Sequence, residues 1–315
     1  MVNPTPANPD PLIALLKHYD HVEPSARVKT VCDAISKRHN GHVLGFVYYG
    51  SSLRDMNNAD KMLDFYVLID SYRKTHKNPL RAALNAMIPP AVYYHEMTHQ
   101  DGVLTTCKYS LISIKAFENR ATSKALLSTV WGRFSQPCVM LFPKDDTVND
   151  RIMQARAKAV RHIASETIPL LEGPVDTATF WARGFRESYR TELRPESSDG
   201  RSREIVARYQ ERYDAIMAEL FGAADESLYA LPPVSAGAKR RCKTRWAFRR
   251  MLGKPMTAIR LINNAATFDG GLDYVLRKLK NHSGVTIEPT SFQRKHPVIC
   301  APVLGWKLWR KGAFR

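Results

Sequence analysis

Two short stretches carry residue types that could hold a phosphorylated substrate and a metal ion. A Gly-Ser pair, Gly50-Ser51, closes one apolar run, and twelve residues (52–63) separate it from Asp64 at the next run. The glycine lets backbone N–H groups approach a triphosphate, Ser51 and Ser52 offer hydroxyls, and a carboxylate can hold a magnesium ion that bridges phosphates. The pattern indicates a nucleotide site; an ordinary strand, turn and hairpin is the alternative.

The elements that must position these residues are buried strands. The runs Val43–Ser52 and Leu63–Asp70 are rich in β-branched and aromatic residues and are bounded by glycine or charged residues. Further strands are predicted at 91–94, 105–114 and 138–142, and helices at 11–19, 24–40, 79–88 and 115–131. This order predicts an α/β domain, a mixed sheet with flanking helices, that ends near Lys144.

Beyond that point the apolar periodicity is helical. Helices are predicted at 150–171, 177–191, 202–221 and 257–282, with a Pro/Gly/Ser-containing linker at 227–238. We therefore expect three consecutive parts: an α/β domain at 1–145, a helical domain at 146–235, and a basic C-terminal helix and tail at 236–315.

The net charge of +17 is concentrated in the last part. Residues 236–315 hold eighteen Lys and Arg against Asp269, Asp273 and Glu288, a charge of +15 that leaves +2 for residues 1–235. Such a segment is attracted to a polyanion, either anionic lipid or nucleic acid.

Other features narrow the class of protein. The five cysteines are scattered without a CxxC pair, which indicates reduced thiols and neither a zinc site nor a disulfide framework. The N-terminus lacks the pattern of a signal peptide. The longest uncharged apolar stretch, 297–306, is far short of the roughly 20 residues needed to cross a bilayer, so we expect any membrane contact to be peripheral.

Several motifs, taken in order, resemble the mitochondrial-type phosphatidate cytidylyltransferases, peripheral-membrane CDP-diacylglycerol synthases of the nucleotidyltransferase superfamily. The first group is Tyr49-Gly50-Ser51-Ser52, Leu63-Asp64-Phe65, Val92-Tyr93-Tyr94 and Lys108-Tyr109-Ser110-Leu111-Ile112-Ser113. The second is Trp131-Gly132-Arg133-Phe134 with Gln136-Pro137, Ser188-Tyr189 with Glu192 and Arg194, Thr267–Leu272, and a basic tryptophan-containing terminus. The resemblance runs from about residue 40 to the end of the chain.

The resemblance implies transfer of a cytidylyl group from CTP to phosphatidic acid, with Mg²⁺, at the cytoplasmic or matrix face of an inner membrane. The implied catalytic residues are Asp64 and Lys108. The implied nucleotide-binding residues are Gly50, Ser51, Ser52, Tyr109, Arg133, Ser188, Tyr189 and Arg194. The chain departs from the family where residues 70–89 form a shorter segment, and where His95 replaces the usual Asn.

A second metal carboxylate is not adjacent to Asp64 in sequence, since Tyr66 occupies the position two residues on, where many nucleotidyltransferases have a second acid. Asp70 shares the same strand face but lies about 20 Å away at about 3.3 Å per residue. Glu96, after the Tyr93-Tyr94 strand, is the favoured second ligand.

Several of these side chains have simpler interpretations. Lys108 could be a surface lysine at a strand end, and Arg133 and Arg194 could cap helix carbonyls. Tyr109 and Tyr189 could be core aromatics. The string from His95 to His99 matches the zinc-protease pattern His-Glu-x-x-His, which requires a helix; its position after Pro89-Pro90 predicts a strand and argues against zinc.

Two other functions remain open. The acceptor could be a nucleic-acid end or a soluble phosphate, or the chain could be a non-catalytic protein whose basic segment binds RNA or DNA. Trp306 and Trp309 favour lipid, because tryptophan prefers the headgroup region, and we expect them to enter the interface together with Leu308.

Overall fold

The computed structural model describes residues 10–55, 58, 61–76, 78–87, 89–99, 101–192, 198–267, 272, 276, 279–280, 283–295 and 297–312. The chain forms two compact units, each built from two separate parts of the sequence. The first unit combines Met1–Glu23 with Ile114–Lys254, and the second combines Pro24–Ser113 with Pro255–Arg315. These boundaries differ from the three consecutive parts expected from the sequence.

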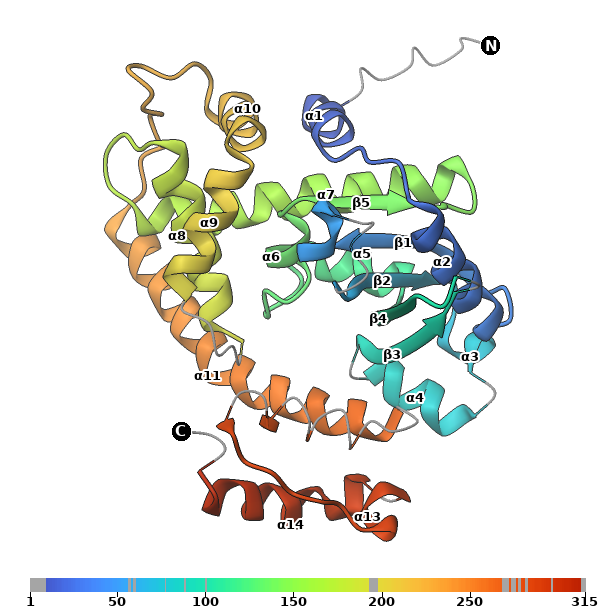
Figure 1. The fold of residues 1–315 in the computed structure, drawn as a ribbon. Helices are drawn as coiled ribbons and strands as arrows, with labels where there is room; N and C mark the ends of the chain where they lie inside the picture. The colour runs from blue at the N-terminus through green and yellow to red at the C-terminus, as the bar shows by residue number, and fades with distance from the viewer. Residues whose placement is uncertain are drawn as a thin grey trace. The chain divides into compact units, whose positions relative to one another are not determined.

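The sheet is mixed and has five strands in the order β3-β4-β2-β1-β5 (Figure 1). Its strands are β1 (Val43–Tyr49), β2 (Leu63–Ile69), β3 (Ala91–Thr98), β4 (Leu104–Ser113) and β5 (Cys138–Leu141). Strands β1 and β2 are antiparallel, β2 and β4 are parallel, and β3 and β4 are antiparallel. The expected mixed sheet with flanking helices is confirmed.

In the second unit, α2 (Ala26–Arg38) precedes the first strand. Ser25 caps its N-terminus by accepting a hydrogen bond from the Val28 N–H at 3.4 Å, and the helix buries the apolar face predicted from the sequence, Val28, Val31, Cys32 and Ile35. Shorter helices join the strands: η1 (Ser51–Arg54), α3 (Tyr72–Thr75) and α4 (Pro79–Met87).

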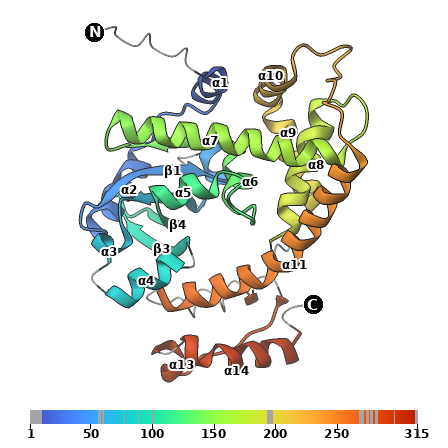
Figure 2. The same ribbon diagram turned by 180° about the vertical axis from the view of Figure 1, so that it is seen from behind.

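The first unit is helical apart from β5. It contains α1 (Pro11–Tyr19), α5 (Ile114–Arg120), α6 (Trp131–Phe134), α7 (Asp146–Thr167), η2 (Ile168–Leu170), α8 (Thr177–Arg190), α9 (Ser198–Arg208), α10 (Gln210–Phe221) and the first part of α11 (Ala236–Thr267). The long helix α7 contacts α1, α5, α6 and α8 (Figure 2). The single helix expected at 115–131 is two helices, because α5 ends at Arg120 and residues 121–130 form turns.

A buried cluster of charges ties the N-terminal segment to the first unit. The Asp20 carboxylate accepts hydrogen bonds from Arg212 at 2.8 and 3.0 Å and also pairs with Arg156. All three side chains are at most 2% exposed. A buried carboxylate needs such compensation, so Asp20 fixes the residues around α1 against α7 and α10.

The C-terminal part of the second unit contains α13 (Ser291–Lys295) and α14 (Pro297–Arg310). Leu304 and Leu308 of α14 form a small buried cluster with Leu272 and Leu276. No helix in the described part of the chain is long and apolar enough to span a bilayer.

Candidate functional site

Gly50 and Asp64 meet at the end of β1. The antiparallel register pairs Tyr49 with Asp64, so the chain leaves β1 directly beside that carboxylate. Gly50 has φ of +92°, in the region that favours glycine, and a Cβ added there would lie 3.0 Å from Asp64 Oδ2. The structure thus brings together the two motif halves that are separated in sequence.

Lys108 lies next to Asp64 on the neighbouring strand. The parallel pairing of β2 and β4 places Asp64 opposite Lys108, so both side chains point to the same face of the sheet. Tyr66, two residues after Asp64, shares this face, and its ring centroid lies 5.7 Å from that of Tyr49. One face of the sheet therefore presents a carboxylate, an ammonium group and aromatic rings around a close backbone turn.

The two serines that follow Gly50 have different environments. Ser51 is exposed, whereas Ser52 is fully buried. Burial raises the pKa of the Tyr48 phenol, on the neighbouring strand, to about 12. Ser52 therefore belongs to the interior beneath the turn, and Ser51 offers the accessible hydroxyl.

Arg27, which the sequence analysis did not single out, holds the loop before Asp64. Its guanidinium donates to the Lys61 carbonyl at 3.1 Å and to Thr105 Oγ1 at 2.7 Å, and it also contacts the Asn58 carbonyl. An arginine in the first turn of a helix has no sequence signature for this role. Its contacts connect α2, the loop and β4 just before the proposed metal carboxylate.

Glu96 lies on the same face of the sheet as Asp64, one strand beyond Lys108. β3 is separated from β2 by β4, and the register offsets Glu96 by two residues, so the Cα atoms of Glu96 and Asp64 are about 12 Å apart by strand spacing. Glu96 is exposed and accepts a hydrogen bond from Tyr94. Among the described residues, no group of three or more His, Cys, Asp or Glu side chains is arranged to hold a metal.

Asp64 alone still fits a magnesium–nucleotide complex. Mg²⁺ is commonly held by one or two carboxylates together with substrate phosphates and water. A Cβ on Gly50 would lie 3.0 Å from Asp64 Oδ2, so the glycine keeps a side chain away from the carboxylate. The donor chemistry of this edge therefore matches the ion that the motif implies.

Tyr109 lies on the opposite face of the sheet from Lys108. It is fully buried, its hydroxyl is 2.9 Å from His39 Nε2, and its ring stacks on that of Tyr93 with centroids 5.2 Å apart. Burial lowers the pKa of His39 to about 4, with smaller effects from the nearby charges of Arg38, His76 and Arg81. This arrangement makes Tyr109 part of the core beneath α2 and not of the Asp64 face.

The other motif residues form a second cluster, in the first unit. Gly132 packs against Ser188 so closely that a Cβ at position 132 would lie 2.1 Å from Ser188 Oγ. The Tyr189 hydroxyl donates to Gln136 Oε1 at 2.9 Å, and Gln136 donates to the Gly132 carbonyl at 2.9 Å. Two motifs more than fifty residues apart in sequence are therefore joined directly.

Arg133 and Glu192 form the charged edge of this second cluster. Arg133 Nη2 lies 3.5 Å from Glu192 Oε1, and both side chains are partly buried. Ser128 and Thr191, which the sequence analysis did not identify, also belong to this second cluster. Their hydroxyls are 2.9 Å apart, and the Thr191 hydroxyl donates to the Ser188 carbonyl at 2.7 Å. Thr191 lies beside a recognised motif, but only the fold shows its partner.

Two motif predictions have different outcomes. Arg194 lies outside the described residues. His95 and Glu96 belong to β3, so adjacent side chains alternate between faces and the helical arrangement of a zinc protease is absent from this described segment. His99 Nε2 instead lies 2.9 Å from Thr105 Oγ1.

No protein-family model matches the chain, and no curated protein matches it. The family resemblance therefore rests on the sequence motifs alone.

The C-terminal helix α14 exposes a mixed apolar and basic surface. Trp306 is 56% and Trp309 is 67% exposed, and the Arg310 guanidinium lies 4.8 Å from the Trp306 ring centroid. Leu308 is only 5% exposed because it packs against Leu272, Leu276 and Leu304. The expectation that Leu308 enters an interface is therefore wrong for this structure, whereas both tryptophans are accessible.

Proposed function

We propose that this protein transfers a cytidylyl group from CTP to phosphatidic acid at a membrane surface, producing CDP-diacylglycerol and pyrophosphate. The observation that carries the proposal is the contact between the Gly50 backbone and the Asp64 carboxylate, with Lys108 in register on the next strand. The choice of CTP and of the lipid acceptor comes from the family resemblance.

In this proposal, Asp64 is the protein ligand of Mg²⁺, and the ion neutralises phosphate charge when bound. The Gly50 turn and the Ser51 hydroxyl contact the triphosphate. Lys108 stabilises the negative charge that develops on the departing pyrophosphate. On the same face, the Tyr49 ring packs against the buried Tyr66 ring, with centroids 5.7 Å apart.

The chemical step is an in-line displacement. A phosphate oxygen of phosphatidic acid attacks the α-phosphorus of CTP, the bond from that phosphorus to the β-phosphate bridging oxygen breaks, and the electron pair leaves with pyrophosphate. A phosphate monoester is already ionised at neutral pH, so no protein side chain has to act as general base. The protein's contribution is positioning and charge stabilisation.

The second cluster fits a role in binding phosphate or nucleotide. Arg133 offers a planar guanidinium suited to phosphate, and its neighbour Glu192 holds it in place at 3.5 Å. The Gly132–Ser188 contact and the Tyr189–Gln136 hydrogen bond give this region a fixed shape. Such rigidity is what a binding site needs to orient a substrate.

Membrane attachment is proposed for the exposed surface of α14. Tryptophan side chains partition to the headgroup region, and Lys307 and Arg310 in the last turn supply charges for anionic lipid. The outer surface of α11 has a similar composition: Phe248 is 45% and Met251 60% exposed, near exposed Arg241 and Lys243. Exposed aromatic groups beside basic groups favour lipid over nucleic acid as the polyanion.

The deciding experiment incubates purified protein with Mg²⁺, labelled CTP and phosphatidic acid in detergent and separates the lipid products. We expect labelled CDP-diacylglycerol, and little product with ATP, GTP or UTP. Parallel reactions with an RNA 3′ end and with a soluble phosphate monoester test the other acceptors. If product forms only with one of these acceptors, that acceptor replaces phosphatidic acid in the proposal. If no product forms with any nucleotide, the result favours a non-catalytic basic binding protein.

A further inference from the structure

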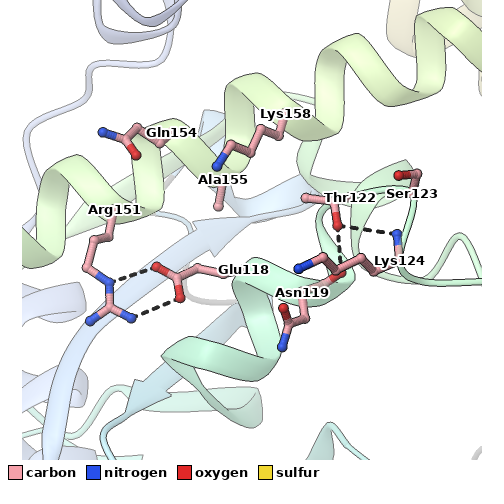
Figure 3. A pocket seen from close by; sticks show the side chains of 9 residues that line it. All are labelled: Glu118, Asn119, Thr122, Ser123, Lys124, Arg151, Gln154, Ala155 and Lys158. Carbon is pink, nitrogen blue, oxygen red and sulfur yellow. Dashed lines mark hydrogen bonds and ion pairs between the residues drawn. The ribbon is translucent and has the colours of Figure 1, made fainter.

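A polar cavity of about 430 Å³ lies beside α5 and α7 of the first unit (Figure 3). Its floor and walls include Glu118 and Asn119 of α5, Ser123 and Lys124 of the following loop, and Arg151 and Lys158 of α7. It shares no lining residue with the Gly50–Asp64 edge or with the Gly132–Ser188 cluster. Its volume lies within the range of sites for small ligands.

The charges around this cavity do not cancel. Arg151 donates two parallel hydrogen bonds to the Glu118 carboxylate, at 2.7 and 2.9 Å, so that pair is internally neutralised and links α5 to α7. Lys124 and Lys158 add two further positive charges, and within the described chain neither lysine forms an ion pair. Figure 3 shows Lys158 reaching from α7 and Lys124 from the loop after α5 toward the same space.

Two ammonium groups directed at one cavity repel each other, and an anion between them removes that repulsion. The neutral lining also favours a polar ligand. Asn119 and Ser123 can donate hydrogen bonds, whereas the Thr122 hydroxyl is already used, donating to the Asn119 carbonyl at 3.0 Å and accepting from the Lys124 N–H at 3.4 Å. None of the nine residues lining the cavity, all within the described chain, is aromatic, so no side chain is placed to stack on a nucleobase.

We propose that this cavity binds a phosphate-bearing anion through Lys124 and Lys158, with the Arg151–Glu118 ion pair as part of its lining. The phosphate can come from a soluble ion or from a lipid headgroup, since both present the same dianionic group. The site does not depend on the proposed cytidylyl transfer, and its test requires no turnover.

The test compares two full-length double variants that remove the same charge. Lys124→Gln with Lys158→Gln alters the cavity; Lys29→Gln with Lys144→Gln removes two exposed lysines that do not line it. Sodium pyrophosphate binding is measured by calorimetry, and binding to phosphatidylcholine vesicles with and without phosphatidic acid is measured by co-sedimentation. We expect the cavity variant to bind at least one of these probes about tenfold more weakly, because charge-assisted hydrogen bonds are lost, and the control to match the wild type.

The pattern of losses identifies the source of the phosphate. A loss confined to pyrophosphate indicates a soluble anion, and a loss confined to phosphatidic acid vesicles indicates a lipid headgroup. Circular dichroism and thermal unfolding confirm that each variant is folded, and Lys124→Arg with Lys158→Arg should retain binding. The proposal is overturned if the wild type binds neither probe, or if the cavity variant and the charge-matched control lose affinity equally.

Discussion

The Gly50 backbone lies directly against the Asp64 carboxylate, so close that a Cβ at position 50 would be 3.0 Å from Asp64 Oδ2. The contact arises because β1 ends where β2 begins in an antiparallel pair, and because Gly50 adopts a positive φ. Any side chain at this position must displace either the turn or the carboxylate. The relationship makes Gly50 and Asp64 one functional unit of the proposed phosphate site.

Gly50→Ala should reduce cytidylyl transfer more than it reduces stability. The added methyl group pushes on Asp64, and the Gly50 backbone, at φ +92° and ψ −164°, lies in a region nearly restricted to glycine that costs a residue with a Cβ about 1–3 kcal/mol. The control is Gly102→Ala, where φ is +80° and no atom lies within 4 Å of the added Cβ. Turnover and urea unfolding are measured for both variants. Equal losses of activity would show that backbone strain, and not the Asp64 contact, is responsible.

Asp64→Asn should abolish turnover while leaving the fold intact, because it removes a metal-binding charge without changing the shape of the side chain. Asp70→Asn is the control: that residue is exposed, lies at the other end of β2 and pairs with Lys74 at 3.1 Å. Initial rates are measured over a range of Mg²⁺ concentrations. Activity of Asp64→Asn above about a tenth of wild type would remove Asp64 from the proposed metal site.

Gly132→Ala should destabilise the first unit by about 1–3 kcal/mol, the usual cost of overpacking a filled interior. The new Cβ would lie 2.1 Å from Ser188 Oγ and 3.1 Å from Ser188 Cβ. Ser188→Gly in the same chain removes both atoms and should restore part of the lost stability. Urea unfolding of the two single variants and the double variant gives the coupling free energy. Gly237→Ala, with its nearest contact at 3.6 Å, is the control, and a coupling near zero would contradict the predicted clash.

Replacing Trp306 and Trp309 by alanine should weaken binding to anionic vesicles without changing CTP binding. Both side chains are exposed, and the net charge is unchanged, so the apolar part of membrane binding is tested alone. Truncation after Pro302 is a less specific test, because it also removes Leu304 and Leu308 from their buried cluster. Unaltered co-sedimentation of the double variant, together with strong salt-sensitive RNA binding, would favour a nucleic-acid partner.

Acidification should destabilise the second unit through His39. Its pKa is about 4 in the folded chain against 6.5 ordinarily, so between these values the unfolded state binds more protons. Stability is therefore retained above pH 6.5 and falls as the pH decreases toward 4, by up to about 3 kcal/mol for a shift of this size. Urea unfolding from pH 7.5 to 4 should show a smaller loss for His39→Gln than for the wild type. Parallel curves for the two proteins would exclude His39 as a source of the pH dependence.

Local structure was largely predictable from the sequence. The strands containing Gly45 and Phe65 and the buried face of α2 follow from short-range patterns, because alternation and helical periodicity depend only on neighbouring residues. The closeness of Gly50 and Asp64 was also predictable. Two consecutive strands joined by a loop have few registers in which the apolar residues of both strands are buried. The concentration of positive charge after residue 236 is a property of composition alone.

Only the tertiary structure decided which distant residues share a core. Asp20 joins the first unit because its carboxylate is neutralised by Arg156 and Arg212, which are 136 and 192 residues away. The contact between Gly132 and Ser188 is also set by the tertiary structure. Position 132 has no room for a side chain because the Ser188 hydroxyl occupies the space. Long-range packing also decides that Ser51 is exposed while Ser52 is buried, and that Trp309 is exposed while Leu308 is buried. A linear pattern specifies the face on which a side chain lies, but the element that covers this face is chosen by the free energy of the whole fold.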